Sequence, residues 1–255
     1  MMYKKNLVFV IALLLFGCNT NSNNDGDTIG QFISDLNKLS HSKSYLNICL
    51  QTDKDAVVEL NLAGNSLLIL PENLIQFKKL KSLNLSGNQI DTLPDLTCFA
   101  QLEYLDLAGN KLKTIPRLSG LTNLRELNLM LNKDFPSNLI LDLPTSLEVL
   151  NLNSSGISKL TLLHSEKLTN LETVDVEGND FLELPESLNN LPNLKKLKLR
   201  LNRINKLDPD IVNRLNVLTY TPSYLSNKEQ VLQVVSNKKI EIDTIWLMPD
   251  GREIY

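Results

Sequence analysis

The segment Leu102-Glu103-Tyr104-Leu105-Asp106-Leu107-Ala108-Gly109-Asn110 decides the fold of this chain. Its apolar residues alternate with polar or small ones, which is typical of a short strand that buries one face. We therefore expect Leu105 and Leu107 to point into a core. The side chains between them, Tyr104 and Asp106, point outward and are not required by the strand itself.

The same pattern recurs along most of the chain at a nearly constant period. Its first apolar residue falls at Val57, Leu80, Leu102, Leu124, Leu147, Leu171, Leu194 and, in degenerate form, Leu215. Successive units begin 21 to 24 residues apart, a regularity that indicates an array of structural repeats. Each repeat buries its apolar side against its neighbours, so the ends of the array need covers.

This L-x-x-L-x-L-x-x-N pattern resembles the leucine-rich repeat family over about two thirds of the chain. The resemblance implies an α/β solenoid, with a curved parallel sheet on its concave face and short helices, 3-10 turns or irregular coils on its convex face. We expect seven repeats and a degenerate eighth over residues 57–223. Residues 28–56 form an N-terminal helical cap and residues 224–255 a C-terminal cap of a helix and a hairpin.

An asparagine closes the strand segment in most repeats. The asparagines that fall in register are Asn65, Asn88, Asn110, Asn132, Asn179 and Asn202. A buried amide at this turn can satisfy backbone groups of neighbouring coils, so we interpret the row as a structural asparagine ladder and not as a binding row.

The fourth and fifth repeats depart from the pattern. Proline follows the asparagine by six residues in several repeats, as at Pro94 and Pro185, but the fifth repeat has Ser155 in place of the asparagine and Thr161 in place of the proline. We expect a local irregularity here, either a longer loop or a small kink in the solenoid.

The N-terminus has the features of an export signal. Residues 1–17 contain two lysines, an apolar core and a small residue, and we interpret them as a signal peptide. Leu15-Phe16-Gly17-Cys18 resembles the lipobox of bacterial lipoproteins, although that family usually has a smaller residue at the position of Phe16. The resemblance implies that Cys18 is acylated; the alternative is an ordinary signal peptide with an incidental cysteine.

An acylated Cys18 would place the protein on a membrane without spanning it. Residues 18–27 contain no apolar residue after the cysteine and are expected to form a flexible tether. We therefore expect an exported protein that is lipid-anchored to a bacterial membrane, on its periplasmic or its surface face.

Catalysis and cofactor binding are not expected. The chain has only two histidines, His41 and His164, and neither has a patterned nucleophile or acid partner. No cysteine and histidine cluster indicates a metal site. Cys49 and Cys98 could pair in an exported protein, although buried unpaired thiols are the simpler interpretation. We therefore predict neither an enzyme nor a bound cofactor or metal.

Charge and composition favour an ordinary folded protein. The chain is 42% hydrophobic and has a formal net charge of −3, so it can bury a full core and lacks the basic surface that nucleic-acid binding usually needs. We expect a monomer.

The outward strand positions are where function is expected, because stacked repeats present them as one continuous surface. The candidate partner-binding residues are Tyr104, Asp106, Glu126, Met130, Val149, Asp175, Glu177, Lys196, Lys198 and Arg200. Aromatic residues, methionine and arginine are enriched at interface cores, which favours a protein partner. The simpler interpretation is a solvated surface that tolerates scattered apolar residues.

The basic strand from Lys195 to Arg200 raises an alternative function. Four cations on one strand could bind a sulfated or phosphorylated glycan or another polyanion. The neighbouring acidic coil would repel a long nucleic acid.

Overall fold

The computed structural model describes residues 57–70, 72–221, 224–238, 241–244, 246–247 and 253–254. The predicted signal peptide, tether and N-terminal cap, together with Cys18 and Cys49, lie outside the described residues. Within the described part of the chain, no helix is long and apolar enough to cross a bilayer.

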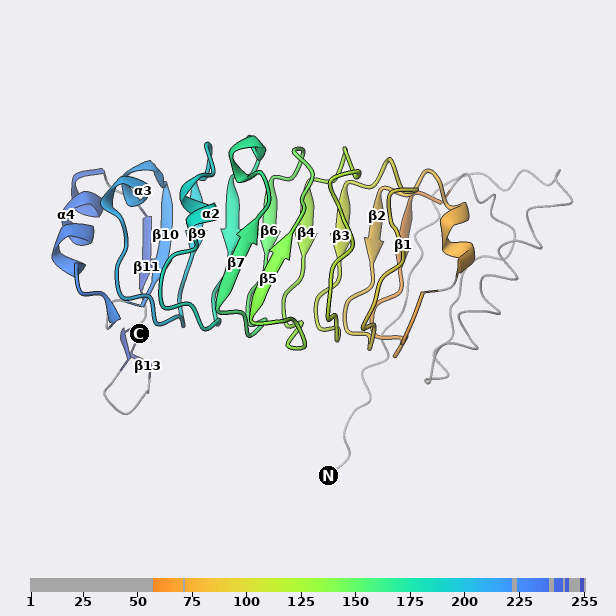
Figure 1. Cartoon of the computed structure of the whole chain (residues 1–255), viewed down its shortest axis with the longest axis horizontal. Helices are drawn as coiled ribbons and strands as arrows, with labels where there is room; N and C mark the ends of the chain where they lie inside the picture. Colours follow the sequence, from red (N-terminus) through yellow and green to blue (C-terminus); the bar gives the residue numbers. More distant parts are fainter. Residues whose placement is uncertain are drawn as a thin grey trace, which may run out of the picture.

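A nine-stranded parallel sheet runs the length of the molecule (Figure 1). Its strands, in spatial order, are β1 (Glu59–Asn61), β2 (Ser82–Asn84), β3 (Tyr104–Asp106), β4 (Glu126–Asn128), β6 (Val149–Asn151), β8 (Thr173–Asp175), β9 (Lys196–Lys198), β10 (Val217–Tyr220) and β11 (Glu241–Thr244). Each strand is followed by a coil that returns to the start of the next strand. The predicted solenoid with a parallel sheet is confirmed.

The strands stack in phase. Tyr104 of β3 lies opposite Ser82 of β2 and Glu126 of β4, and Glu126 lies opposite Val149 of β6. The constant repeat length produces this register, because each coil adds one strand at the same height. Equivalent outward residues therefore form rows across the sheet, and we call this outward surface the sheet face.

The inward residues fill a continuous core. Leu105 and Leu107 of the third repeat are fully buried, as the alternating pattern predicts. They belong to one cluster that extends from Val57 to Val235. Burying a leucine side chain contributes roughly 1.5–3 kcal/mol, so the repeated leucines supply the main stabilising force of the array.

The asparagine row lies at the end of the strands and is buried. Asn110 is representative: its Oδ1 accepts the Ile90 N–H (3.1 Å), and its Nδ2 donates to the carbonyls of Leu85 and Leu107 (3.0 Å each). One side chain thus joins two successive coils. In the fifth repeat Ser155 takes the place of the asparagine. Its shorter side chain makes a similar bond, in which the hydroxyl donates to the Leu129 carbonyl (3.1 Å).

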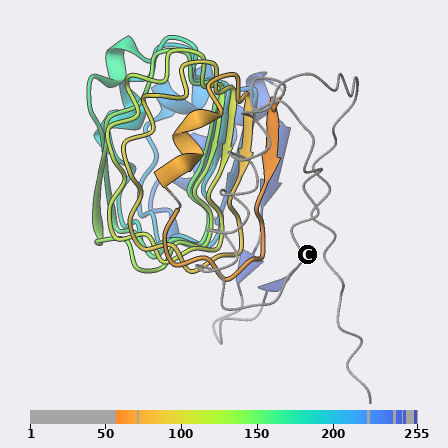
Figure 2. The ribbon, with the colours of Figure 1, turned by 90° about the vertical axis from the view of Figure 1, so that its right-hand side faces the viewer.

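The irregular repeats form a second sheet. β5 (Asn138–Leu141) and β7 (Lys159–Leu162) pair in parallel and lie apart from the nine-stranded sheet. Viewed along the solenoid, this green segment lies on the side opposite the sheet face (Figure 2), and we call that side the coil face. The irregularity is therefore an added strand pair, because Thr161 keeps the N–H that proline lacks in other repeats.

Short helices complete the coil face. They are η2 (Glu72–Gln76), η3 (Ser165–Lys167), α2 (Glu186–Asn189) and α3 (Pro209–Arg214). Asp208 begins α3 with its side chain, which accepts the Asp210 N–H (2.9 Å), a typical N-cap bond.

The C-terminal segment adds one strand to the nine-stranded sheet and then forms a separate hairpin. α4 (Lys228–Lys238) is followed by β11, which pairs in parallel with β10. β12 (Trp246–Leu247) and β13 (Glu253–Ile254) form an antiparallel hairpin. The segment predicted as a separate cap therefore contributes the ninth strand of the repeat sheet in addition to a helix and a hairpin.

Candidate functional site

The middle row of the sheet face has a structural role that its sequence did not reveal. Each polar residue at the end of a strand accepts the backbone N–H of the residue two positions later. The six residues are Asn61, Asn84, Asp106, Asn128, Asn151 and Asp175, with distances of 2.9 to 3.2 Å. Such bonds shape the turn that leaves each strand.

Asparagine makes this turn as well as aspartate does, so the turn does not require the charge of Asp106. The carboxylate is largely buried and forms no ion pair with another described residue. Its second oxygen accepts a hydrogen bond from the Tyr104 hydroxyl (3.2 Å). Asp106 is therefore a charged group held at the surface between an aromatic ring and a turn.

Tyr104 lies half-buried on β3 beside this carboxylate. Burial, the charge of Asp106 and the hydrogen bond to it, together with Glu126 on β4, raise the pKa of the Tyr104 hydroxyl to about 12. The phenol consequently stays protonated as a hydrogen-bond donor at all physiological pH values. Together Tyr104, Asp106 and Glu126 present one apolar ring and two carboxylates.

Apolar side chains border the same region. Met130 and Val149 are half-buried at the next two strands. Leu131 is 40% exposed and has a φ of 59°, in the left-handed region. Equivalent positions in four other repeats hold glycine, such as Gly109 at φ 63°, whereas Ser154 (φ 55°) and Leu201 (φ 56°) share the left-handed conformation of Leu131. A leucine in this conformation is strained, and the repeat pattern alone gave no reason to single it out.

We define the acidic-apolar cluster as Tyr104, Asp106, Glu126, Met130, Leu131 and Val149. The in-phase register brings five of these predicted residues to three neighbouring strands, and the sixth, Leu131, was not predicted. The only sequence signal for Leu131 is the replacement of the glycine found before Asn110.

The other predicted residues lie at a separate end of the sheet face, where opposite charges pair across the strands. Lys198 Nζ lies 3.2 Å from Asp175 Oδ2, and Arg200 Nε lies 2.7 Å from Glu177 Oε1. Asp175 and Glu177 are largely buried. These four residues therefore satisfy one another in the folded chain.

Glu177 is held by two successive strands. Thr219 of β10 donates its hydroxyl to Glu177 Oε1 (2.6 Å), in addition to the Arg200 contact from β9. Burial raises the pKa of the Glu177 carboxyl, but the hydrogen bonds from Arg200 and Thr219 and the charge of Arg200 outweigh it, and the pKa falls below its usual value. The carboxylate is thus ionised and structural.

The basic strand offers less free charge than its sequence indicates. Lys195 forms an ion pair with Glu172, and Lys198 and Arg200 pair as described above. Lys196 is exposed and has no ion-pair partner in the described part of the chain. Because an anionic ligand would compete with these internal carboxylates, the arrangement does not favour the polyanion alternative.

Nothing in the described residues resembles a catalytic or metal centre. Those residues contain no group of three or more histidine, cysteine, aspartate or glutamate side chains placed to hold a metal ion. His164 is exposed on the coil face, with its backbone at φ 55°. Cys98 is half-buried and unpaired among the described residues, and burial raises the pKa of its thiol. The preferred interpretation of Cys98 and Cys49 as unpaired thiols stays a prediction, because Cys49 lies outside the described residues.

Comparison with known families agrees with this geometry. Two family models, both described as leucine-rich repeat, match residues 78–133 and 170–191. The chain is a leucine-rich repeat protein. The matched segments contain β2, β3, β4 and β8, so the family pattern and the in-phase strands coincide.

Two solved structures are similar to this leucine-rich repeat protein. One is a leucine-rich repeat protein of Leptospira interrogans, with 27% identity, a TM-score of 0.52 and a match over 74% of this chain and 55% of that one. The chain thus spans about half the length of that relative. The other is internalin C2 of Listeria monocytogenes, with 19% identity, a TM-score of 0.60 and 84% and 92% coverage, which shows the shared fold.

Leucine-rich repeat domains commonly mediate interactions between proteins, and the fold is typically a non-enzymatic interaction module. The chain is therefore consistent with a recognition module. The fold serves many partners, so the choice of binding surface depends on the particular side chains of this chain.

Proposed function

We propose that this protein is a membrane-anchored recognition module that binds a protein partner through the acidic-apolar cluster of the sheet face. The observation that carries the proposal is the carboxylate of Asp106, which has no cationic partner among the described residues and accepts a hydrogen bond from the half-buried Tyr104. Asn84 and Asn128 lie opposite it on the neighbouring strands, and Met130 and Val149 add half-buried apolar side chains to the same part of the sheet face. A basic side chain flanked by apolar residues would complement this surface.

The contrast between the two ends of the sheet face supports this choice. At β8 to β10 the carboxylates of Asp175 and Glu177 already have cationic partners. At β3 and β4 the carboxylates of Asp106 and Glu126 have none among the described residues. A partner that supplies a cation there gains a charge-assisted hydrogen bond without breaking an internal one.

Leu131 adds a strained, exposed apolar side chain to the same location; Leu201 has the same conformation at the other end of the sheet face, where the carboxylates are already paired. Glycine would adopt this backbone conformation without cost, yet the chain has an exposed leucine. A strained residue with an exposed apolar side chain is suited to a contact made with another molecule.

Binding is tested by replacing the cluster without disturbing the fold. Asp106→Asn keeps the turn, because Asn128 makes the same turn on the next strand. Tyr104→Ala combined with Met130→Ala removes the apolar anchors. We expect the first variant to weaken partner binding at least about tenfold and the second about thirtyfold, as for residues at the centre of an interface.

The measurement is capture of partners from bacterial envelope extracts, followed by titration of the captured protein with purified wild type and variants. Ile69→Ser replaces an exposed apolar residue outside the cluster and serves as the control. Equal affinity of wild type, Asp106→Asn and the double variant would remove the cluster from the proposal.

The membrane anchor is the second part of the proposal. It depends on the lipobox-like sequence that ends at Cys18 and on the polar segment that follows it. An anchor of this kind would hold the recognition module near a membrane surface while the tether leaves it free to orient.

A further inference from the structure

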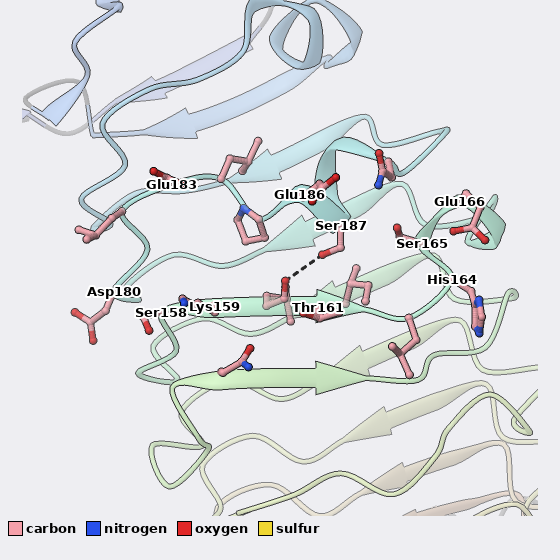
Figure 3. Close-up of a pocket in the computed structure, with 18 of the residues that line it drawn as sticks. Ser158, Lys159, Thr161, His164, Ser165, Glu166, Asp180, Glu183, Glu186 and Ser187 are labelled. Carbon is pink, nitrogen blue, oxygen red and sulfur yellow. Dashed lines mark hydrogen bonds between the residues drawn. The ribbon is translucent and has the colours of Figure 1, made fainter.

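A groove on the coil face borders the second sheet. It has a volume of about 1320 Å³ and lies between β7 and the coil that contains Leu182 and α2. Figure 3 shows β7 crossing the floor of the groove, with Glu183, Glu186 and Ser187 on the following coil. The groove lies on the opposite side of the solenoid from the sheet face.

One edge of β7 is paired and the other is open. On the paired side, the N–H groups of Lys159 and Leu163 donate to the carbonyls of Ser137 and Leu141 (2.9 Å each). In a parallel ladder the residues between these positions direct their backbone groups to the opposite edge. Leu160 and Leu162 therefore turn their N–H and C=O groups toward the groove.

Only one of these four backbone groups has a partner in the described chain. The Ser187 hydroxyl donates to the Leu160 carbonyl (3.2 Å), as drawn in Figure 3. The N–H groups of Leu160 and Leu162 and the carbonyl of Leu162 form no hydrogen bond with another described residue. An unpaired strand edge is a template for another strand.

The solenoid explains why this edge is open. The next coil stays close at its start, where the Asp180 N–H donates to the Ile157 carbonyl (2.9 Å). It then reaches Pro185 and begins α2 instead of forming a third strand. Pro185 has no backbone N–H to donate to a neighbouring strand, so this coil does not extend the two-stranded sheet. β7 therefore remains the edge strand of that sheet.

The side chains around the open edge specify the chemistry of an occupant. Leu163 is 40% exposed and Leu182 is 56% exposed, which provides apolar contacts. The charged lining residues are Glu166, Asp180, Glu183, Glu186, Lys159 and Arg203. Carboxylates outnumber cations, and Arg203 already pairs with Asp180 (3.4 Å).

We propose that this groove binds an extended segment of a protein partner, rich in alternating basic and apolar residues, which adds to the open edge of β7 as a third strand. Backbone hydrogen bonds to Leu160 and Leu162 would hold the segment, and the exposed leucines and carboxylates would select its side chains. The site is independent of the acidic-apolar cluster, so the two proposals can fail separately.

A synthetic peptide of about ten alternating lysine and valine residues, long enough for one strand, is the probe. Binding to the full chain is measured by fluorescence anisotropy, and amide hydrogen exchange is followed by NMR. We expect the amides of Leu160 and Leu162 to become protected on binding. The amides of Lys159 and Leu163, which are already bonded, serve as internal controls.

Two comparisons separate strand addition from general attraction of charge. The same peptide with alternate backbone nitrogens methylated keeps its charge and loses half its N–H donors, and we expect it to bind at least about tenfold more weakly. Leu182→Ser combined with Glu183→Lys should weaken binding by a similar factor. Ile69→Ser combined with Glu59→Lys changes the same residue types elsewhere and should have no effect.

The proposal is overturned by any of three results. One is no binding at millimolar peptide, and another is binding that methylation leaves unchanged. The third is protection of the Leu160 and Leu162 amides in the protein alone at high concentration together with dimer formation in sedimentation, because the occupant would then be a second copy of the chain.

Discussion

At the scale of single residues, this chain departs from its own repeat where the fold gains nothing from the change. Asp106 replaces an asparagine that would make the same turn, and Leu131 replaces a glycine that would fit the same backbone without strain. The same two replacements recur outside the acidic-apolar cluster at Asp175 and Leu201, but there the aspartate forms an ion pair with Lys198, which Asp106 lacks. Departures of this kind point to a function other than stability.

Replacing the strained leucine should stabilise the protein. Leu131→Gly relieves the left-handed backbone conformation, and we expect the free energy of unfolding to rise by about 1 kcal/mol. Urea unfolding followed by circular dichroism measures the change. Gly109→Leu makes the reverse exchange in the preceding repeat and should destabilise. If Leu131→Gly lowers stability, the side chain contributes to folding and the functional interpretation of its strain is wrong.

Removing a ladder asparagine should have the opposite effect. Asn110→Ala leaves the buried Ile90 N–H without a partner and removes one of the two hydrogen bonds to each of the Leu85 and Leu107 carbonyls. We expect a loss of about 2 kcal/mol, since a buried unsatisfied group costs about 1–3 kcal/mol. Asn193→Ala is the control, because its exposed amide makes one bond to the Thr169 carbonyl (2.8 Å). A similar small loss for both variants in urea unfolding would contradict the ladder interpretation.

At the scale of elements, neighbouring strands are joined by charges as well as by backbone bonds. Glu177 on the turn after β8 is linked to Arg200 after β9 and to Thr219 of β10, so one carboxylate spans three strands. The contacts are partly shielded from water, which makes them stronger than the exposed ion pairs of other coils.

This carboxylate should make stability depend on pH. Its pKa lies below the usual value of 4.5, so its contribution is present above that pH and is lost as the pH falls through the folded pKa. We expect the drop in unfolding free energy between about pH 7 and about pH 3 to be smaller in Glu177→Gln than in wild type. Glu59→Gln, at an exposed carboxylate, should leave the drop unchanged. Identical pH profiles for wild type and Glu177→Gln would show that the Glu177 carboxylate does not contribute to the pH dependence of stability.

The elements also show how far the sequence alone predicts this fold. The repeat strands follow the leucine pattern, because alternation and a constant period specify both the buried face and the register. They are β1, β2, β3, β4, β6, β8 and β9. β11 was predicted as part of the cap, because its Glu-Ile-Asp-Thr sequence lacks the leucine pattern while its place is fixed by packing on β10. The sequence did not predict β5 and β7 as strands, because their pairing depends on Thr161 standing where other repeats have proline.

The candidate site was predicted only in part for similar reasons. The sequence places Tyr104, Glu126 and Val149 in one row, since the row follows from the register. The same register places Asn128 beside Asp106 and Lys198 beside Asp175. The sequence does not show that the Lys198 side chain reaches the Asp175 carboxylate, at 3.2 Å. The pattern also treats the position of Leu131 as variable and does not reveal its backbone conformation.

At the scale of the whole molecule, the repeats form one continuous sheet and core that the proposed lipid anchor would hold at a membrane. In the proposed arrangement, retention at the membrane depends on the lipid attached to Cys18. The tether and the repeats would then have separate roles, with the first setting location and the second setting partner choice.

This division predicts a simple change of location. Cys18→Ala removes the thiol that a lipid would modify, and we expect the protein to lose incorporation of a labelled fatty acid and to move from the membrane fraction to the soluble fraction. Partner binding by the purified variant should equal that of wild type. Fatty-acid labelling that persists in Cys18→Ala would rule out this residue as the attachment point.

The in-phase stacking of the strands also limits how a regular partner can follow the sheet face. Adjacent strands are about 4.8 Å apart, whereas one turn of an α-helix rises about 5.4 Å. A helix laid across the strands would therefore drift by about 0.6 Å per strand and would be out of step by a full strand after about eight. Over the three strands of the acidic-apolar cluster the mismatch stays below the length of a covalent bond, so a short helical epitope can match this solenoid while a long straight one cannot.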